Sequence, residues 1–241
     1  MPTPAGARAA HHAADSRRCR QTKPPPGGKV RRRITYMGFF SDHSRKKKIV
    51  VLLGHPDSGA TLSGEIALLY EMAAKKAGHE VRRFNVGDMR FDPILRQGYK
   101  AIQELEPDLK ALQAAISWCD HFVIVYPNWW CTMPALLKGV FDRMWLPAFA
   151  FSMRKNKQGV LTGGWKKLLK GKTARVFVLS GTHPFFLWLL MGDYTNEIKR
   201  AVLWFAGFKV KVSRFGPSDQ APEWKKNEWR RKAARLGKLG E

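Results

Sequence analysis

Cysteine is scarce in this chain, which has three cysteines among 241 residues. Cys19, Cys119 and Cys131 are widely spaced and form neither a Cys-x-x-Cys pair nor another spacing typical of metal ligands. The seven histidines form no metal-binding pattern either. The sequence therefore predicts no metal site, and a reducing cytoplasm is the simplest expected location.

Long apolar runs are missing as well. No stretch reaches the roughly 20 apolar residues that a membrane-spanning helix needs, so the sequence predicts a soluble protein without a transmembrane segment. The N-terminus also lacks the apolar region of a secretory signal. The 44% content of hydrophobic residues still suffices for a full core, and the length favours one sizeable domain with appendages.

Acidic residues are few, with 19 Asp and Glu against 43 Lys and Arg, which gives a formal net charge of +24. Such a charge favours nonspecific contact with nucleic acid, acidic partners or an anionic membrane surface. No RNA- or DNA-binding motif accompanies the charge, so we expect no specific nucleic-acid partner. Peripheral contact with a membrane stays open.

The basic residues are concentrated at the N-terminus, where residues 1–48 hold 13 Lys or Arg against Asp15 and Asp42. Few apolar residues are present there to offset the entropy of ordering, so residues 1–47 are predicted to be a disordered basic extension of a domain at 48–241. Two alternatives are an organelle-targeting segment and an over-extended start, with Met37 as the true first residue.

The most informative stretch runs from His121 to Trp145. Residues 122–126 are a short, β-branched apolar run that predicts a buried parallel strand. After Pro134, apolar residues recur at helical spacing and predict a helix. The intervening residues 127–132 therefore lie at the carboxyl end of a strand, where ligands bind in open α/β sheets.

Two adjacent tryptophans, Trp129 and Trp130, stand in this loop. Indoles offer flat apolar surface for stacking, and loop N–H groups can donate to a ring, so a planar heterocycle would fit. The alternative is that one or both tryptophans cap the core. Cys131 beside them is more simply explained as a packed thiol.

A second loop, at residues 54–63, follows the apolar run 49–53 and precedes a predicted helix at 61–77. A strand, a Gly-containing loop with hydroxyls and a helix together present backbone N–H groups and a positive dipole to phosphate. The loop has neither a Gly-x-Gly-x-x-Gly pattern nor a P-loop lysine, so the phosphate of a mononucleotide fits better.

The rest of the chain continues the alternation of strands and helices. Strands are predicted at 80–86, 174–179 and 208–215, and helices at 107–118, 193–206 and 222–239, the last packing through Trp224 and Trp229. This order predicts a doubly wound parallel sheet of five strands with helices on both faces.

Two segments do not fit that alternation. Residues 146–172 form a long excursion, which is either functional, dimer-forming or a solvated basic loop. Residues 185–191 are apolar all round, which favours a buried helix, with a dimer contact or the wall of a hydrophobic pocket as alternatives. Together the two segments favour a homodimer.

The stretch 126–145 resembles the flavin-contacting loop and following helix of the flavodoxin-like NAD(P)H:quinone oxidoreductases. That family has an aromatic residue, Pro, any residue, a Trp-rich pair, and then Pro-Ala-x-Leu-Lys-Gly with an acidic residue and Arg. Residues 54–63 are similar to the family's flavin-phosphate loop, with one residue more than usual, and residues 88–94 to a connecting segment. The resemblance covers about residues 48–237.

This resemblance implies a flavodoxin-like fold, bound FMN or, in longer members, FAD, and two-electron reduction of a quinone-type acceptor by NADH or NADPH. A ping-pong mechanism is expected because one open flavin face must serve both donor and acceptor. The resemblance leaves two other functions open, a flavin-binding regulatory subunit of a membrane transporter and an electron-carrier flavoprotein. The basic charge disfavours the carrier.

Residue by residue, the resemblance carries a flavin site onto three strand-end loops. Residues 180–184 depart from the family's Thr-Thr-Gly-Gly pattern, which leaves the part played by His183 open, and we take this histidine as the candidate catalytic residue. The expected cofactor-binding residues are His55, Ser58, Thr61, Leu62, Ser63, Pro127, Asn128, Trp129, Trp130, Ser180, Gly181 and Thr182.

Overall fold

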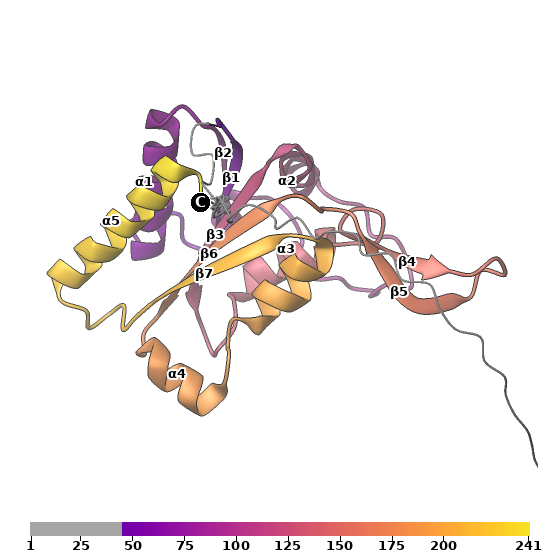
Figure 1. Ribbon diagram of the computed structural model, residues 1–241. Helices are drawn as coiled ribbons and strands as arrows, with labels where there is room; N and C mark the ends of the chain where they lie inside the picture. The colour runs from indigo at the N-terminus through magenta and orange to yellow at the C-terminus, as the bar shows by residue number, and fades with distance from the viewer. Residues whose placement is uncertain (1–44) are drawn as a thin grey trace, which may run out of the picture. The chain divides into compact units, whose positions relative to one another are not determined.

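The computed structural model describes residues 45–241, so the predicted N-terminal extension lies almost entirely outside the described residues. Five parallel strands form one sheet in the order β2-β1-β3-β6-β7 (Figure 1). The predicted five-stranded parallel sheet is therefore confirmed, and its order is that of a flavodoxin-like fold. The strands are β1 (Lys48–Leu53), β2 (Glu80–Asn85), β3 (His121–Asn128), β6 (Thr173–Ser180) and β7 (Lys209–Phe215).

Helices cover both faces of this sheet, as the alternation predicted. Helices α1 (Leu62–Lys76) and α5 (Glu223–Leu239) lie together on one face (Figure 1). The other face is covered by α2 (Pro107–Trp118), α3 (Ala135–Met144) and η2 (Glu197–Trp204). Two short elements complete the set, η1 (Val86–Asp88) and α4 (Pro184–Met191).

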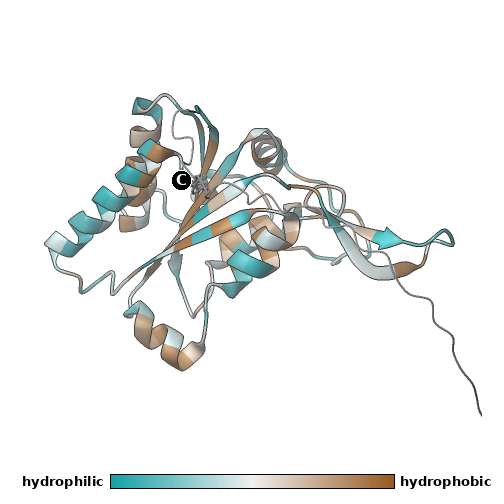
Figure 2. Ribbon diagram, viewed as in Figure 1, coloured by the Kyte–Doolittle hydropathy of each residue, from teal (hydrophilic) through white to brown (hydrophobic). Residues whose placement is uncertain are grey.

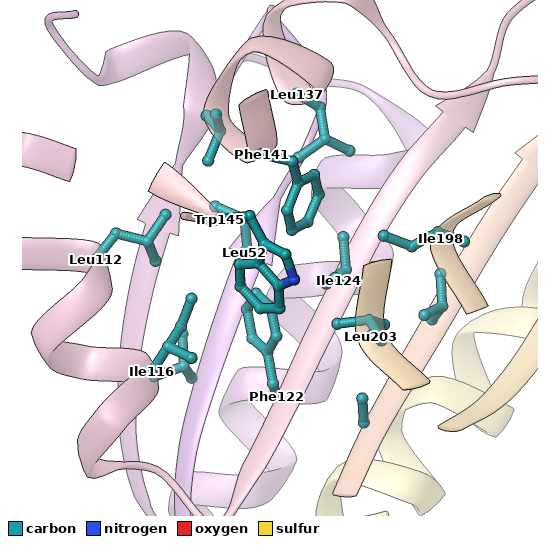
Figure 3. Close-up of a cluster of buried hydrophobic side chains, with 14 of the residues drawn as sticks. Leu52, Leu112, Ile116, Phe122, Ile124, Leu137, Phe141, Trp145, Ile198 and Leu203 are labelled. Atoms are coloured by element: carbon teal, nitrogen blue, oxygen red, sulfur yellow. The ribbon is translucent and has the colours of Figure 1, made fainter. Parts of the chain in front are cut away.

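The central strands are buried on both faces because successive side chains point to opposite sides. In β3, Val123 and Val125 pack toward α1 and α5, whereas Phe122 and Ile124 pack toward the other helices. Apolar runs without alternation are the pattern of such doubly covered strands. Figure 3 shows this second cluster, with Leu52, Phe122 and Ile124 from the sheet, Leu112 and Ile116 from α2, Leu137, Phe141 and Trp145 from α3 and its end, and Ile198 and Leu203 from η2.

The connection from β2 to α2 is tied to α3 by one buried arginine. Arg143 is 1% exposed and donates from its two terminal nitrogens to both carboxylate oxygens of Glu106 at 3.0 Å. It also donates to the carbonyl oxygens of Asp92 and Glu104. Burial by itself raises the pKa of Glu106, but the hydrogen bonds from Arg143 and from the backbone N–H groups of Asp92 and Glu106, with the charge of Arg143, together hold that pKa below its usual range.

The excursion at 146–172 is more ordered than a solvated loop. It contains an antiparallel hairpin, β4 (Phe151–Lys155) and β5 (Leu161–Lys167), which is separate from the main sheet (Figure 1). The side chain of Asn156 closes the turn by accepting from the backbone N–H groups of Gln158 and Val160. The exposed strands lack a clear apolar alternation, which is why the sequence did not reveal them.

Three other expectations need correction. The helix predicted at 193–206 is π-helical over Glu197–Trp204. Trp229 stacks on Phe215 with ring centroids 5.2 Å apart, but Trp224 is 66% exposed, so the prediction that it packs was wrong. The favoured burial of 185–191 was also wrong, because α4 forms but has no buried residue, and Figure 2 shows it largely apolar.

Candidate functional site

The carboxyl ends of β1, β3 and β6 open onto one cleft of about 760 Å³. This volume lies in the range of small-molecule and cofactor sites. All the expected cofactor-binding residues line the cleft except Ser58. They are His55, Thr61, Leu62, Ser63, Pro127, Asn128, Trp129, Trp130, Ser180, Gly181 and Thr182.

The N-terminus of α1 forms one side of the cleft. Thr61 is the N-cap, and its hydroxyl oxygen accepts from the N–H of Gly64 at 3.0 Å. The first N–H groups of a helix have no partner within it, so those of Leu62 and Ser63 are available to an anion. Both residues line the cleft, which makes this helix end suitable for a phosphate group.

Ser58 serves the loop rather than the cleft. Its hydroxyl donates to Asp88 at 2.6 Å, and Asn85 donates to the same carboxylate at 2.8 Å. These hydrogen bonds, first from Ser58 and then from Asn85, hold the pKa of Asp88 below its usual range. A Cβ atom at Gly87 would lie 1.9 Å from the carbonyl oxygen of Pro56, so only glycine permits this close approach.

The two tryptophans lie on a tight turn after β3. Two backbone hydrogen bonds between Trp129 and Thr132, of 3.0 and 3.1 Å, close the turn. Its central residues, Trp130 and Cys131, have φ values of 53° and 63°, in the left-handed region that favours glycine. Backbone strain of this kind, about 1–3 kcal/mol for each residue, is typical of functional sites.

Neither indole caps the core. Trp130 is 98% exposed and Trp129 is 45% exposed. Trp129 meets the ring of His55 edge to face, with centroids 5.7 Å apart. The hydroxyl of Thr132 donates to Glu197 of η2 and so fixes the far end of the turn. The turn therefore holds both indoles at the open side of the cleft.

Asn128 supplies a buried polar atom that a ligand could pair. Its Oδ1 atom is buried and has no hydrogen-bond partner within residues 45–241. Asn128 pairs in register with Ser180 of β6, so the ends of the two central strands meet beside it. Buried polar groups are rarely left unpaired, and a planar heterocycle with ring N–H and C=O groups would satisfy this amide. The residues of the cleft therefore fit a flavin.

His183, the candidate catalytic residue, does not line the cleft. It is the N-cap of α4, and its Nδ1 accepts from the N–H of Phe185 at 3.3 Å. Its ring also meets Phe186 edge to face at 6.0 Å. The position indicates a capping role, and a catalytic part for this histidine stays a prediction without support from the geometry.

Several lining residues were not expected. Ser218, Asp219 and Lys226 follow the end of β7, so the rule that ligands bind at strand ends could have indicated this fourth loop. Leu187 and Met191 come from α4, for which a pocket wall was one alternative. The full additional set is Cys131, Leu179, Leu187, Met191, Ser218, Asp219 and Lys226.

Comparison with known proteins gives one family match. A family described as having a flavodoxin-like fold matches residues 47–236. An uncharacterized NAD(P)H oxidoreductase of Haemophilus influenzae is 29% identical over 139 residues. The alignment covers 56% of this chain and 64% of the relative, so the chain spans less than two thirds of that protein's length.

Solved structures show the same fold. The NAD(P)H:quinone oxidoreductase of Methanothermobacter marburgensis superposes with a TM-score of 0.67 at 21% identity, covering 82% of this chain and 100% of the other. An FMN-dependent NADH-azoreductase of Bacillus anthracis, in complex with FMN, has a TM-score of 0.54 at 18% identity, covering 78% and 96%. The family match over residues 47–236 confirms the flavodoxin-like fold that the resemblance implied, and both structures share that fold. The reductase activities are those of the other proteins and stay a prediction for this chain.

Proposed function

Because the chain belongs to the family with the flavodoxin-like fold, we propose that it is a flavin-dependent reductase that transfers hydride from NADH or NADPH through bound FMN to a quinone or similar acceptor. One observation carries the proposal. Three strand-end loops and the N-terminus of α1 converge on a single cleft that contains a buried, unpaired amide oxygen and two exposed indoles. FAD is the alternative cofactor.

Each part of the cleft has a task in this proposal. The N–H groups of Leu62 and Ser63, at the positive end of α1, bind the single phosphate of FMN. Lys226, on the first turn of α5, adds positive charge to the same cleft. We take FMN as the cofactor because the N-terminus of α1 offers a site for its single phosphate.

The residues of the β3 turn hold and orient the ring. Trp129 and Trp130 offer apolar faces, and the amide of Asn128 pairs a polar edge of the heterocycle. The backbone at Gly181 and Thr182 borders the cleft from β6. A flavin bound by these residues would supply the redox chemistry, that is, hydride transfer between the nicotinamide and the acceptor. The task of the protein is to bind the ring and to position it.

We also propose an order of binding, on the expectation that one open face of the flavin serves both donor and acceptor. Nicotinamide and acceptor must occupy the same open side in turn, so the oxidised nicotinamide leaves before the quinone arrives. We therefore propose a ping-pong mechanism, which predicts parallel double-reciprocal plots. Intersecting plots from the purified enzyme would contradict it.

The cofactor is tested first, without any assay of turnover. Denaturing the purified protein should release FMN, identified by chromatography and its absorption spectrum. The double variant Trp129→Ala/Trp130→Ala should bind FMN more weakly, by roughly 1–3 kcal/mol for each lost stack by analogy with base stacking. Trp204→Ala is a matched control, since this half-exposed indole on η2 does not line the cleft.

Two results would count against the proposal. Unchanged FMN affinity in the double variant would remove both tryptophans from the cofactor site. If neither NADH nor NADPH bleached the bound flavin, the regulatory-subunit alternative would be favoured instead.

We also propose that the enzyme is a cytoplasmic homodimer formed through the β4–β5 hairpin. The hairpin stands apart from the main sheet and exposes Met153, Val160 and Leu161. Exposed apolar side chains grouped on one projecting element are typical of a contact between subunits. Light scattering should give twice the mass of the chain, and a monomeric mass with full activity would refute the dimer.

A further inference from the structure

Helix α4 exposes a continuous apolar surface. Phe185, Phe186, Trp188, Leu189, Leu190 and Met191 are each between 55% and 73% exposed. The helix contains neither a charged residue nor a buried one, and Figure 2 shows it apolar along most of its length. Isolated exposed apolar residues need no explanation, but a contiguous patch of this kind marks an interaction surface.

This surface adjoins the cleft. Leu187 and Met191 line the cleft from α4, on the same opening as Trp130. The helix follows directly from the end of β6 and is anchored there by its cap, His183. Whatever covers the exposed side of α4 therefore also borders the entrance through which an acceptor reaches the cleft.

Charge decides between the candidate occupants of this surface. The chain carries a net charge of +24, which attracts an anionic surface, and the proposed dimer is formed through the β4–β5 hairpin rather than through α4. Lys226 lines the same cleft as Leu187 and Met191 of α4, and Lys225 lies 5.6 Å from the ring centroid of the exposed Trp224. Phe, Trp and Leu suit the boundary between headgroups and acyl chains, and Lys and Trp are typical of the headgroup level. This composition therefore suits a membrane surface.

The length of α4 determines how it meets a bilayer. Eight residues extend about 12 Å, far less than the hydrocarbon core. No helix within residues 45–241 is long and apolar enough to cross a membrane. The helix can therefore lie in the boundary between headgroups and acyl chains but cannot span it.

We propose that α4 docks the protein on an anionic membrane surface, and that the cleft takes a lipid-soluble quinone directly from that membrane. The docking half stands on the helix and the charge alone. The quinone half rests on the proposed function, because it names the class of acceptor that this entrance favours.

The test compares two doubly substituted full-length chains. Leu189→Asp/Leu190→Asp places two carboxylates on exposed positions of α4 that do not line the cleft. Leu68→Asp/Met72→Asp is the matched control, because it makes the same change in charge at two exposed apolar positions on α1. Binding is measured by co-sedimentation with vesicles of phosphatidylcholine and phosphatidylglycerol.

The wild type and the control should bind these vesicles, and the α4 variant should bind at least about tenfold more weakly, since its apolar helix is disrupted. With a long-chain quinone embedded in the vesicles, the α4 variant should lose turnover by a similar factor. With a short, water-soluble quinone it should keep wild-type turnover.

Three results would overturn the proposal. One is undiminished vesicle binding by the α4 variant, and another is an equal loss of vesicle binding in the control. The third is dissociation of a wild-type dimer into monomers by the α4 substitutions, which would assign the helix to a second copy. The vesicle measurement needs no turnover, so a failure of flavin reduction would refute the proposed function and leave the docking result readable. Normal turnover without vesicle binding would refute the docking alone.

Discussion

His121 should make the stability of this protein depend steeply on pH. It begins β3 and is 2% exposed, with its Nδ1 atom 2.7 Å from the hydroxyl of Thr173. Its Nε2 atom has no partner within residues 45–241, and its ring stacks on Tyr70. Burial lowers the pKa of His121 to about 3, with a smaller contribution from the positive charge of Lys47.

The sign and size of the effect follow from this depressed pKa. In the unfolded chain a histidine has a pKa of about 6.5, so between these two values the unfolded state binds a proton that the folded state refuses. Stability is therefore unaffected above the unfolded value and falls as the pH drops below it, by about 1.4 kcal/mol per unit. Acidification from pH 7.5 to pH 5 should cost about 2 kcal/mol through His121 alone.

The assay is urea unfolding of the wild type and of His121→Leu at pH 7.5 and pH 5. The variant cannot take up this proton, so its free energy of unfolding should fall by about 2 kcal/mol less over the interval. Other titrating groups act equally in both proteins and cancel. His121 lies at the opposite end of β3 from the cleft, so its substitution should leave the ligand site intact.

His183→Gln serves as the control for the loss of a histidine, because His183 is exposed. Equal losses of stability in His121→Leu and the wild type would refute the assignment of a neutral, buried imidazole to β3.

Two further substitutions test the buried ion pair and the turn. Glu106→Gln should lower the free energy of urea unfolding by about 3 kcal/mol at neutral pH, because it leaves Arg143 buried without its carboxylate. It should also make the stability fall less steeply at acid pH, since the stability from Glu106 is present above the ordinary carboxyl pKa and is lost as the pH falls through the depressed pKa. An unchanged fall of stability at acid pH would contradict this. Trp130→Asn should raise the free energy of unfolding by up to about 1 kcal/mol, because Asn tolerates the left-handed backbone and the exposed indole contributes no packing, while FMN binds more weakly. Destabilisation by Trp130→Asn would show that the turn is unstrained.

The sequence alone determined the framework of the fold and the location of the site. Apolar runs such as 49–53 and 122–126 predict strands buried on both faces, because only a doubly covered strand has no solvent-facing side. Once the strands are parallel, their carboxyl ends lie at one edge, so the loops that follow them must converge there. The local sequence pattern was enough to predict these strands and loops, because each prediction depends only on residues that are neighbours in the chain.

The tertiary structure decided which residues of those loops face the cleft and which surfaces are covered. Ser58 turns toward Asp88 and leaves the cleft, and Lys226 reaches the cleft from the last helix. The apolar run 185–191 and Trp224 consist of residue types that are usually buried, yet both are exposed. Burial depends on whether a distant part of the chain packs against a face, and periodicity within one segment carries no information about that partner.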